Sequence, residues 1–156
     1  MKKILTLAAA GILALLTVTG CEKDPIKSTN ELDVSFTNVA GTWQLMSING
    51  TPLDESLYVY ITFIRKDHLF EMYQNLDSFS ARKITGEFNI QEDAEFGAII
   101  RGKYDHGTGE WEHRYIVSSL TREQMIWTAK DNGEITVYKR VNAIPDDIAN
   151  DYPAEK

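Results

Sequence analysis

Apolar and polar side chains alternate with a period of two through most of the chain beyond residue 41. Between residues 57 and 64, aliphatic and phenylalanine side chains at odd positions alternate with tyrosine, threonine and isoleucine side chains at even positions. This alternation, bounded by Gly, Asn and Asp clusters, is typical of β-strands. The pattern predicts eight strands, over residues 42–48, 57–64, 69–74, 83–90, 96–104, 111–119, 124–129 and 134–140.

The connections between these strands are mostly short, and several carry turn residues. Residues 131–133 read Asp-Asn-Gly, and the Asn-Gly pair tolerates the positive φ angles of a tight hairpin. Residues 105–109 form the next strongest turn signal. Because neighbouring strands should pair as antiparallel hairpins, we expect an all-β, eight-stranded antiparallel up-and-down (meander) barrel, whose closure removes exposed strand edges. A sandwich would need longer crossovers than the loops at 49–56 and 76–82.

Charged positions indicate which side of each strand faces inward. Glu110, Glu112 and Arg114 share one side of the sixth strand and are expected outside. The last strand is ambiguous, because an exterior Lys139 places Ile135 and Val137 outside as well. The side chains expected inside the barrel are Phe70 and Met72; Ile84, Phe88 and Ile90; Trp111, His113, Tyr115 and Val117; and Tyr138 and Arg140.

The first twenty residues carry a separate signal. Lys2 and Lys3 precede an apolar run over residues 4–18, and small residues follow directly before Cys21. A positive start, a short apolar segment and small residues at the cleavage point predict a secretory signal peptide over residues 1–20. Residues 18–21, Val-Thr-Gly-Cys, resemble the lipobox of bacterial lipoproteins. The resemblance implies that Cys21 carries acyl chains such as palmitate, which hold the protein in a membrane.

The rest of the chain divides into three parts by composition. Residues 21–35 are expected to form a flexible lipidated tether, residues 36–142 the barrel, and residues 143–156 an acidic tail. Cleavage would leave 14 basic and 23 acidic residues, a net charge of −9. This charge argues against nucleic acid as a partner. The lipobox resemblance implies a cell-envelope protein anchored to the outer membrane, facing the periplasm or the cell surface.

Residues 41–43, Gly-Thr-Trp, resemble the opening of the first strand in lipocalins, which follows a short helical turn. Residues 34–40 would form that turn. The same family places an Arg from the last strand across the Trp, and Arg140 matches this position. The resemblance implies a lipocalin-like barrel closed at one end by Gly41, Trp43 and Arg140. The chain lacks the family's Thr-Asp-Tyr signature, since residues 120–123 read Leu-Thr-Arg-Glu, and we expect no helix after the eighth strand.

Catalytic and metal-binding patterns are scarce. His106 and His113 lie on either side of one predicted hairpin, but a zinc site needs three or four convergent ligands, and His68 is distant in sequence. Ser118 and Ser119 lack the Gly-x-Ser-x-Gly elbow of hydrolases. We therefore expect no bound metal, no cofactor and no catalytic activity. An unrecognised hydrolase or isomerase is kept as an alternative hypothesis, beside the two binding functions that follow.

The expected function is binding of a small hydrophobic molecule inside the barrel, with the loops 49–56 and 76–82 as gates. A barrel of eight strands either holds one small ligand or is filled by its own side chains. The alternative function is a protein–protein interaction or inhibitor module of the envelope, presenting tyrosines such as Tyr58 or Tyr60. The candidate ligand-binding residues are Phe63, Phe70, Met72, Phe88, Tyr115 and Trp127.

Overall fold

All eight predicted strands are present in the computed structural model, which describes residues 30–76, 81–106 and 109–150. The signal peptide and Cys21 lie outside the described residues. The elements are α1 (Phe36–Val39), β1 (Gly41–Ile48), β2 (Thr51–Pro52), β3 (Val59–Ile64), the 3-10 turn η1 (Lys66–His68), β4 (Leu69–Gln74), β5 (Arg82–Asp93), β6 (Gly97–Tyr104), β7 (Tyr115–Ser118), β8 (Gln124–Ala129), β9 (Ile135–Val141) and α2 (Asp146–Asn150).

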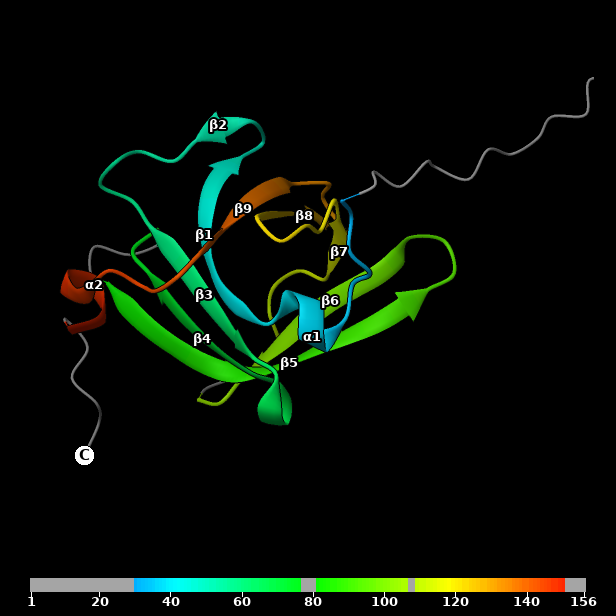
Figure 1. Ribbon diagram of the computed structural model, residues 1–156, viewed down its shortest axis with the longest axis horizontal. Coiled ribbons are helices and arrows are strands. Elements are labelled where there is room, and N and C mark those ends of the chain that lie inside the picture. Colours follow the sequence, from blue (N-terminus) through cyan, green and yellow to red (C-terminus); the bar gives the residue numbers. More distant parts are fainter. Residues whose placement is uncertain (1–29, 77–80, 107–108, 151–156) are drawn as a thin grey trace, which may run out of the picture.

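The strands form one closed antiparallel barrel. Sheet order follows chain order from β3 to β9, and β1 pairs with both β3 and β9. Eight strands therefore close on themselves, which confirms the predicted up-and-down barrel, while the two-residue β2 only pairs with the end of β1. Figure 1 shows the strands curling around a common interior, with the β5–β6 hairpin projecting beyond them.

The barrel has a closed end and an open end. At the closed end lie α1, η1 and the β7–β8 loop; at the open end lie the connections β1–β3, β4–β5, β6–β7 and β8–β9. The predicted turn at 131–133 is one of these connections: Gly133 has a φ of 75°, and the Asn132 side chain accepts a 2.8 Å hydrogen bond from the Glu134 backbone N–H. The gate predicted at 76–82 is also at the open end, but residues 77–80 lie outside the described residues.

Trp43 and Arg140 stabilise the closed end. The Trp43 side chain is fully buried, and its indole N–H donates a 2.8 Å hydrogen bond to the Val39 carbonyl in α1. The Arg140 guanidinium carbon lies 4.0 Å from the Trp43 ring centroid, a cation–π geometry. The same guanidinium donates hydrogen bonds of 2.6 and 2.7 Å to the carbonyls of Ala40 and Asn38. The last strand is thereby fastened to the segment that covers the barrel.

Gly41 allows this arrangement. Its φ is 121°, which side-chain-bearing residues rarely adopt, and a Cβ there would meet the Arg140 guanidinium. The helix α1 begins at the Ser35 N-cap, whose hydroxyl accepts a 3.2 Å hydrogen bond from the Asn38 N–H. Phe36 in α1 stacks on His68 of η1 at a ring separation of 3.7 Å.

Several sequence predictions need correction outside the barrel interior. A short helix, α2, lies in the segment predicted to be a loose tail and follows the last strand, where no helix was expected. Tyr60 is only 7% exposed, so it is not a free tyrosine for partner binding; burial and the nearby Asp147 carboxylate raise its pKa. The ordered contacts also begin before residue 36, because the Leu32 N–H donates to the Leu120 carbonyl at 2.7 Å.

Candidate functional site

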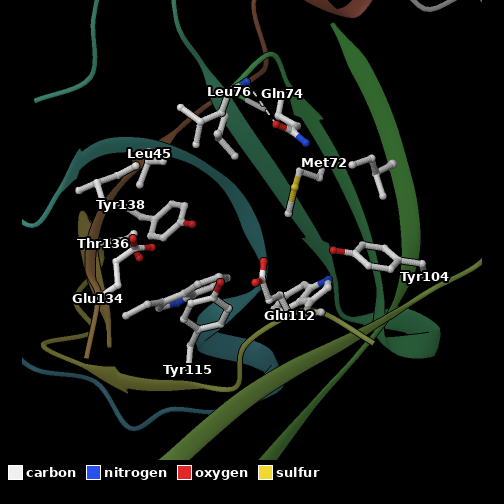
Figure 2. A pocket seen from close by; sticks show the side chains of 15 residues that line it. Leu45, Met72, Gln74, Leu76, Tyr104, Glu112, Tyr115, Glu134, Thr136 and Tyr138 are labelled. Carbon is white, nitrogen blue, oxygen red and sulfur yellow. Dashed lines mark hydrogen bonds between the residues drawn. The ribbon is translucent and has the colours of Figure 1, made fainter. Parts of the chain in front are cut away.

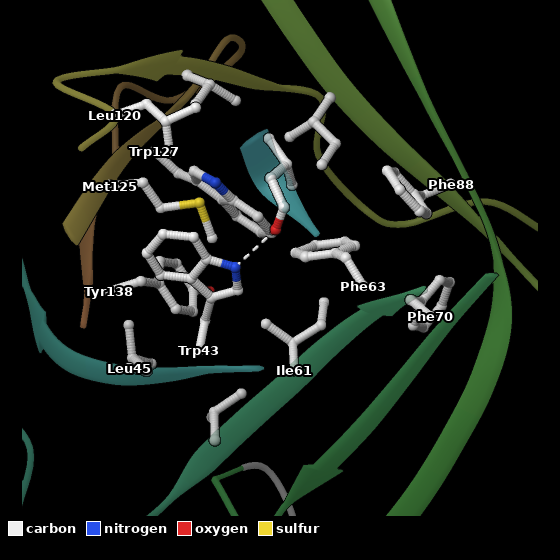
Figure 3. Close-up of a cluster of buried hydrophobic side chains, with 14 of the residues drawn as sticks. Trp43, Leu45, Ile61, Phe63, Phe70, Phe88, Leu120, Met125, Trp127 and Tyr138 are labelled. Atoms are coloured by element: carbon white, nitrogen blue, oxygen red, sulfur yellow. Dashed lines mark hydrogen bonds between the residues drawn. The ribbon is translucent and has the colours of Figure 1, made fainter. Parts of the chain in front are cut away.

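Large apolar side chains fill the closed half of the barrel. Figure 3 shows Trp43, Phe63 and Met125 packed together in this core. The rings of Phe63 and Phe88 are 4.7 Å apart, and those of Phe70 and Trp111 are 5.1 Å apart. This half of the interior has no room for a ligand.

A cavity of about 190 Å³ occupies the open half of the barrel (Figure 2). Eight-stranded barrels are just wide enough to leave one such space when the inward side chains do not fill it. Each of the eight barrel strands contributes at least one residue to the cavity wall. The residues that line it are Leu45, Ile48, Val59, Met72, Gln74, Leu76, Ile84, Tyr104, Trp111, Glu112, Tyr115, Trp127, Glu134, Thr136 and Tyr138.

The six candidate ligand-binding residues divide between these two halves. Met72, Tyr115 and Trp127 line the cavity. Phe63, Phe70 and Phe88 are at most 3% exposed and belong to the packed core instead. All six side chains face the interior, but they lie at different heights along the barrel axis.

Trp111 forms part of the cavity wall because of Gly102. The two residues face each other across the β6–β7 junction, where the Trp111 backbone N–H donates a 2.8 Å hydrogen bond to the Gly102 carbonyl. A Cβ built on Gly102 would come within 2.6 Å of three atoms of the Trp111 indole. Because Gly102 has no side chain, the indole ring can pack directly against the backbone of β6. Close approach of another group is a common reason for glycine within a strand.

Glu112 corrects the predicted orientation of the sixth strand. The sequence pattern placed Glu112 outside, on a strand over residues 111–119. The observed strand β7 begins only at Tyr115, after a bend at Glu112 and His113. The bend breaks the period-two alternation, so the Glu112 side chain is exposed as predicted but lies at the mouth of the cavity instead of on the outer face of a strand.

Oxygen atoms converge on the cavity from several strands. Figure 2 shows the phenol groups of Tyr104, Tyr115 and Tyr138 and the Glu112 carboxylate directed toward its interior. Burial, with smaller contributions from Glu134 and other neighbours, raises the pKa of Tyr115 to about 12. Burial is also the main cause of the raised pKa of Tyr138. Both phenols are therefore neutral hydrogen-bonding groups at physiological pH.

The histidines lie apart from the cavity interior. His113 hydrogen-bonds through Nδ1 to the Asp131 carboxylate at 2.8 Å, and this contact is the main cause of the lowered pKa of Asp131. His68 stacks on Phe36 and His106 is exposed. In the described part of the chain, no three His, Cys, Asp or Glu side chains are placed to hold a metal ion.

Sequence reasoning missed the polar part of the lining. Gln74, Glu112, Glu134 and Thr136 were not candidates, although all four line the cavity. The sequence could have placed Thr136 inside the barrel, because its neighbours Ile135 and Val137 were predicted to face outward. That prediction is confirmed for Ile135, which is 43% exposed, whereas Thr136 is 6% exposed.

The family model described as a lipocalin-like domain matches residues 39–127, more than half of the chain. The chain is similar to a lipocalin-like protein from Bacteroides uniformis, with 16% identity, a TM-score of 0.48, and coverage of 67% of this chain and 99% of that one. It is also similar to an uncharacterized protein from Bacteroides eggerthii, with 17% identity, a TM-score of 0.48, and coverage of 66% and 99%. No curated protein matches the sequence.

Proposed function

The chain belongs to the lipocalin-like domain family, and from this premise we propose that it is an envelope lipoprotein that binds a small, largely hydrophobic molecule at the open end of its barrel. The observation that carries the proposal is the cavity of about 190 Å³ above a fully packed core. A barrel needed only for stability would gain from filling this space, since each large apolar side chain buried contributes about 1.5–3 kcal/mol.

The cavity size limits the ligand. Pockets for drug-sized ligands usually measure about 300–1,000 Å³. The volume of about 190 Å³ corresponds to about six water molecules at ~30 Å³ each. A single aromatic ring with a short side chain fits this space, whereas a larger ligand would project from the open end.

The walls favour an aromatic or apolar body on the ligand. Trp111, Tyr115 and Trp127 present ring surfaces, and Leu45 and Met72 add aliphatic and thioether surface. Rings prefer offset or edge-to-face contacts with other rings, which contribute about 0.5–1.5 kcal/mol beyond area burial. We infer a binding role and no catalytic one, in keeping with the general character of the family.

The membrane anchor is the second part of the proposal and rests on the sequence before Cys21. In the described residues, the N-terminal segment is attached to the closed end: the Glu31 carboxylate accepts a 2.8 Å hydrogen bond from the Ser119 N–H. The described part of the chain therefore begins beside the closed end, away from the cavity. None of the described helices has the length and apolar character needed to cross a membrane.

Ligand binding is tested with protein that lacks residues 1–21, which retains every described residue. Tryptophan emission is followed during titration with three probes that share a phenyl ring and a two-carbon linker, namely phenethyl alcohol, phenethylammonium and hydrocinnamate. Native mass spectrometry records any co-purifying molecule. Saturable binding of at least one probe is expected, and Thr136→Phe should abolish it by occupying the cavity. Thr128→Phe, a control outside the cavity lining, should leave it unchanged. No co-purifying molecule and no binding of any probe would refute the proposal.

The anchor is tested by feeding labelled palmitate to cells that express the full chain. Label should enter the wild-type protein and be absent from Cys21→Ala. Equal labelling of the two proteins, or none in either, would contradict the lipoprotein assignment.

A further inference from the structure

The charged residues of the cavity are all of one sign. Glu112 and Glu134 line it, from the β6–β7 and β8–β9 connections, and the lining contains no Lys, Arg or His. The carboxylates of both residues form no ion pair or hydrogen bond with the part of the chain that the structure describes. Glu112 is exposed and Glu134 is half-buried, so both charges lie at the solvent-facing mouth of the cavity, where a ligand can reach them.

Aromatic rings enclose the space beside these carboxylates. Tyr115 and Trp127 have ring centroids 4.9 Å apart, and Trp127 and Tyr138 have centroids 4.6 Å apart. Trp111 lies 6.2 Å from Tyr115 and 5.6 Å from Trp127. A group of this kind presents the negative faces of several π systems, which attract a cation held within about 6 Å.

A buried acceptor is also free to receive a hydrogen bond. The Thr136 side chain is directed into the cavity in Figure 2, and the residue is 6% exposed. Its hydroxyl lies near enough to the Tyr138 phenol to lower the pKa of that group, but it makes no hydrogen bond of normal length and angle with the described residues. Buried polar groups normally find such a partner. An N–H donor on a ligand would supply one to Thr136 while its charge faces Glu134.

Resting on the proposed function, we propose that the ligand is a small organic ammonium ion with an aromatic or apolar body. The ammonium group lies near Glu112 and Glu134, and the body lies among the rings of Trp111, Tyr115 and Trp127. The raised pKa of Tyr115, to which Glu134 and Glu112 both contribute, is consistent with the negative potential that this requires. The same potential disfavours carboxylate ligands, including fatty acids, because the lining holds no cationic side chain and its unpartnered indole N–H groups, on Trp111 and Trp127, are neutral donors.

Phenethyl alcohol and phenethylammonium match in size and differ in charge, while the slightly larger hydrocinnamate carries the opposite charge. Phenethylammonium should bind at least about tenfold more tightly than phenethyl alcohol, and hydrocinnamate should bind most weakly. Added salt should weaken only the binding of phenethylammonium, because screening acts on charge.

Carboxylate variants locate the effect. Glu112→Gln with Glu134→Gln should remove most of the tenfold preference for phenethylammonium while leaving the affinity for phenethyl alcohol unchanged. Glu87→Gln, on β5 outside this cavity's lining, is the matched control and should retain the preference. Circular dichroism confirms that the variants are folded.

The outcomes separate the two proposals. Equal or tighter binding of phenethyl alcohol or hydrocinnamate overturns the cation inference and leaves ligand binding intact. A preference for phenethylammonium that survives in the double variant also overturns the inference. Binding of none of the three probes overturns both.

Discussion

The contact between Gly102 and Trp111 supports a quantitative prediction for Gly102→Ala. The added Cβ would lie 2.1–2.6 Å from three indole atoms, whereas carbon atoms in good contact are about 3.5–4.0 Å apart. The ring would have to move by more than 1 Å. Trp111 is 7% exposed, and the rings of Phe70 and Trp127 pack against it at 5.1 and 5.6 Å, so this movement displaces other buried side chains.

Overpacking of this kind costs about 1–3 kcal/mol, and the short distances place Gly102→Ala near 3 kcal/mol. Trp111→Ala should cost about 3–5 kcal/mol through lost burial. In the Trp111→Ala background the added methyl group meets no ring, so Gly102→Ala should then cost less than about 0.5 kcal/mol. The coupling energy of the double-mutant cycle is therefore about 2–3 kcal/mol.

Urea unfolding followed by far-ultraviolet circular dichroism measures all four proteins without relying on tryptophan emission. The destabilised variants should unfold at a lower midpoint concentration of urea, while the slope of the unfolding free energy against urea concentration stays constant. The single variant should also melt about 10 °C lower than the wild type. An equal cost of Gly102→Ala in the two backgrounds would refute the proposed steric contact.

Further predictions concern the closed end and the buried phenols. Trp43→Ala should lower the free energy of unfolding by about 3–5 kcal/mol in urea, and an unchanged midpoint would remove Trp43 from the core. Arg140→Met should lower the free energy of unfolding by about 2–4 kcal/mol, because two charge-assisted hydrogen bonds and the cation–π contact are lost. The exposed control Lys139→Met should lower it by less than about 0.5 kcal/mol. Equal effects of the two substitutions would contradict the role of Arg140. The pKa of Tyr115 is about 12 in the folded protein and 10.0 in the unfolded chain. The free energy of unfolding should therefore not vary with the ionisation of Tyr115 below pH 10, and should fall as the pH rises from 10 toward 12. Tyr115→Phe should make that alkaline loss shallower in urea titrations, and an unchanged slope would contradict the raised pKa.

The order of the strands and most of their inward faces were accessible from the sequence, because period-two alternation depends only on which side chains avoid water. The exceptions are Glu112 and His113, which lie in the bend before β7. The inward positions of Tyr138 and Arg140 followed from an exterior Lys139 alone. The two-residue β2 was missed although Asn49 and Gly50, both with positive φ, form the short turn before it. Alternation cannot reveal a strand of only two residues.

The height of each side chain along the barrel axis was not accessible. Phe70 and Met72 are two residues apart on the same face of β4, yet Phe70 belongs to the packed core and Met72 lines the cavity. This difference depends on the stagger between strands, which a single strand's sequence does not encode. The position of Glu112 depends on a bend that has no strong Gly or Pro signal next to it.

The three tryptophans of the chain allow a direct test of where a molecule binds. Trp111 and Trp127 line the cavity, while the Trp43 indole N–H is bonded to Val39 in the closed end. A ¹H–¹⁵N spectrum recorded during titration with phenethylammonium, and separately with phenethyl alcohol, reports all three indole signals. Movement of the Trp111 and Trp127 signals with a stationary Trp43 signal is the predicted result. Movement of Trp43 alone, or of no indole signal with either probe, would contradict a binding site at the open end.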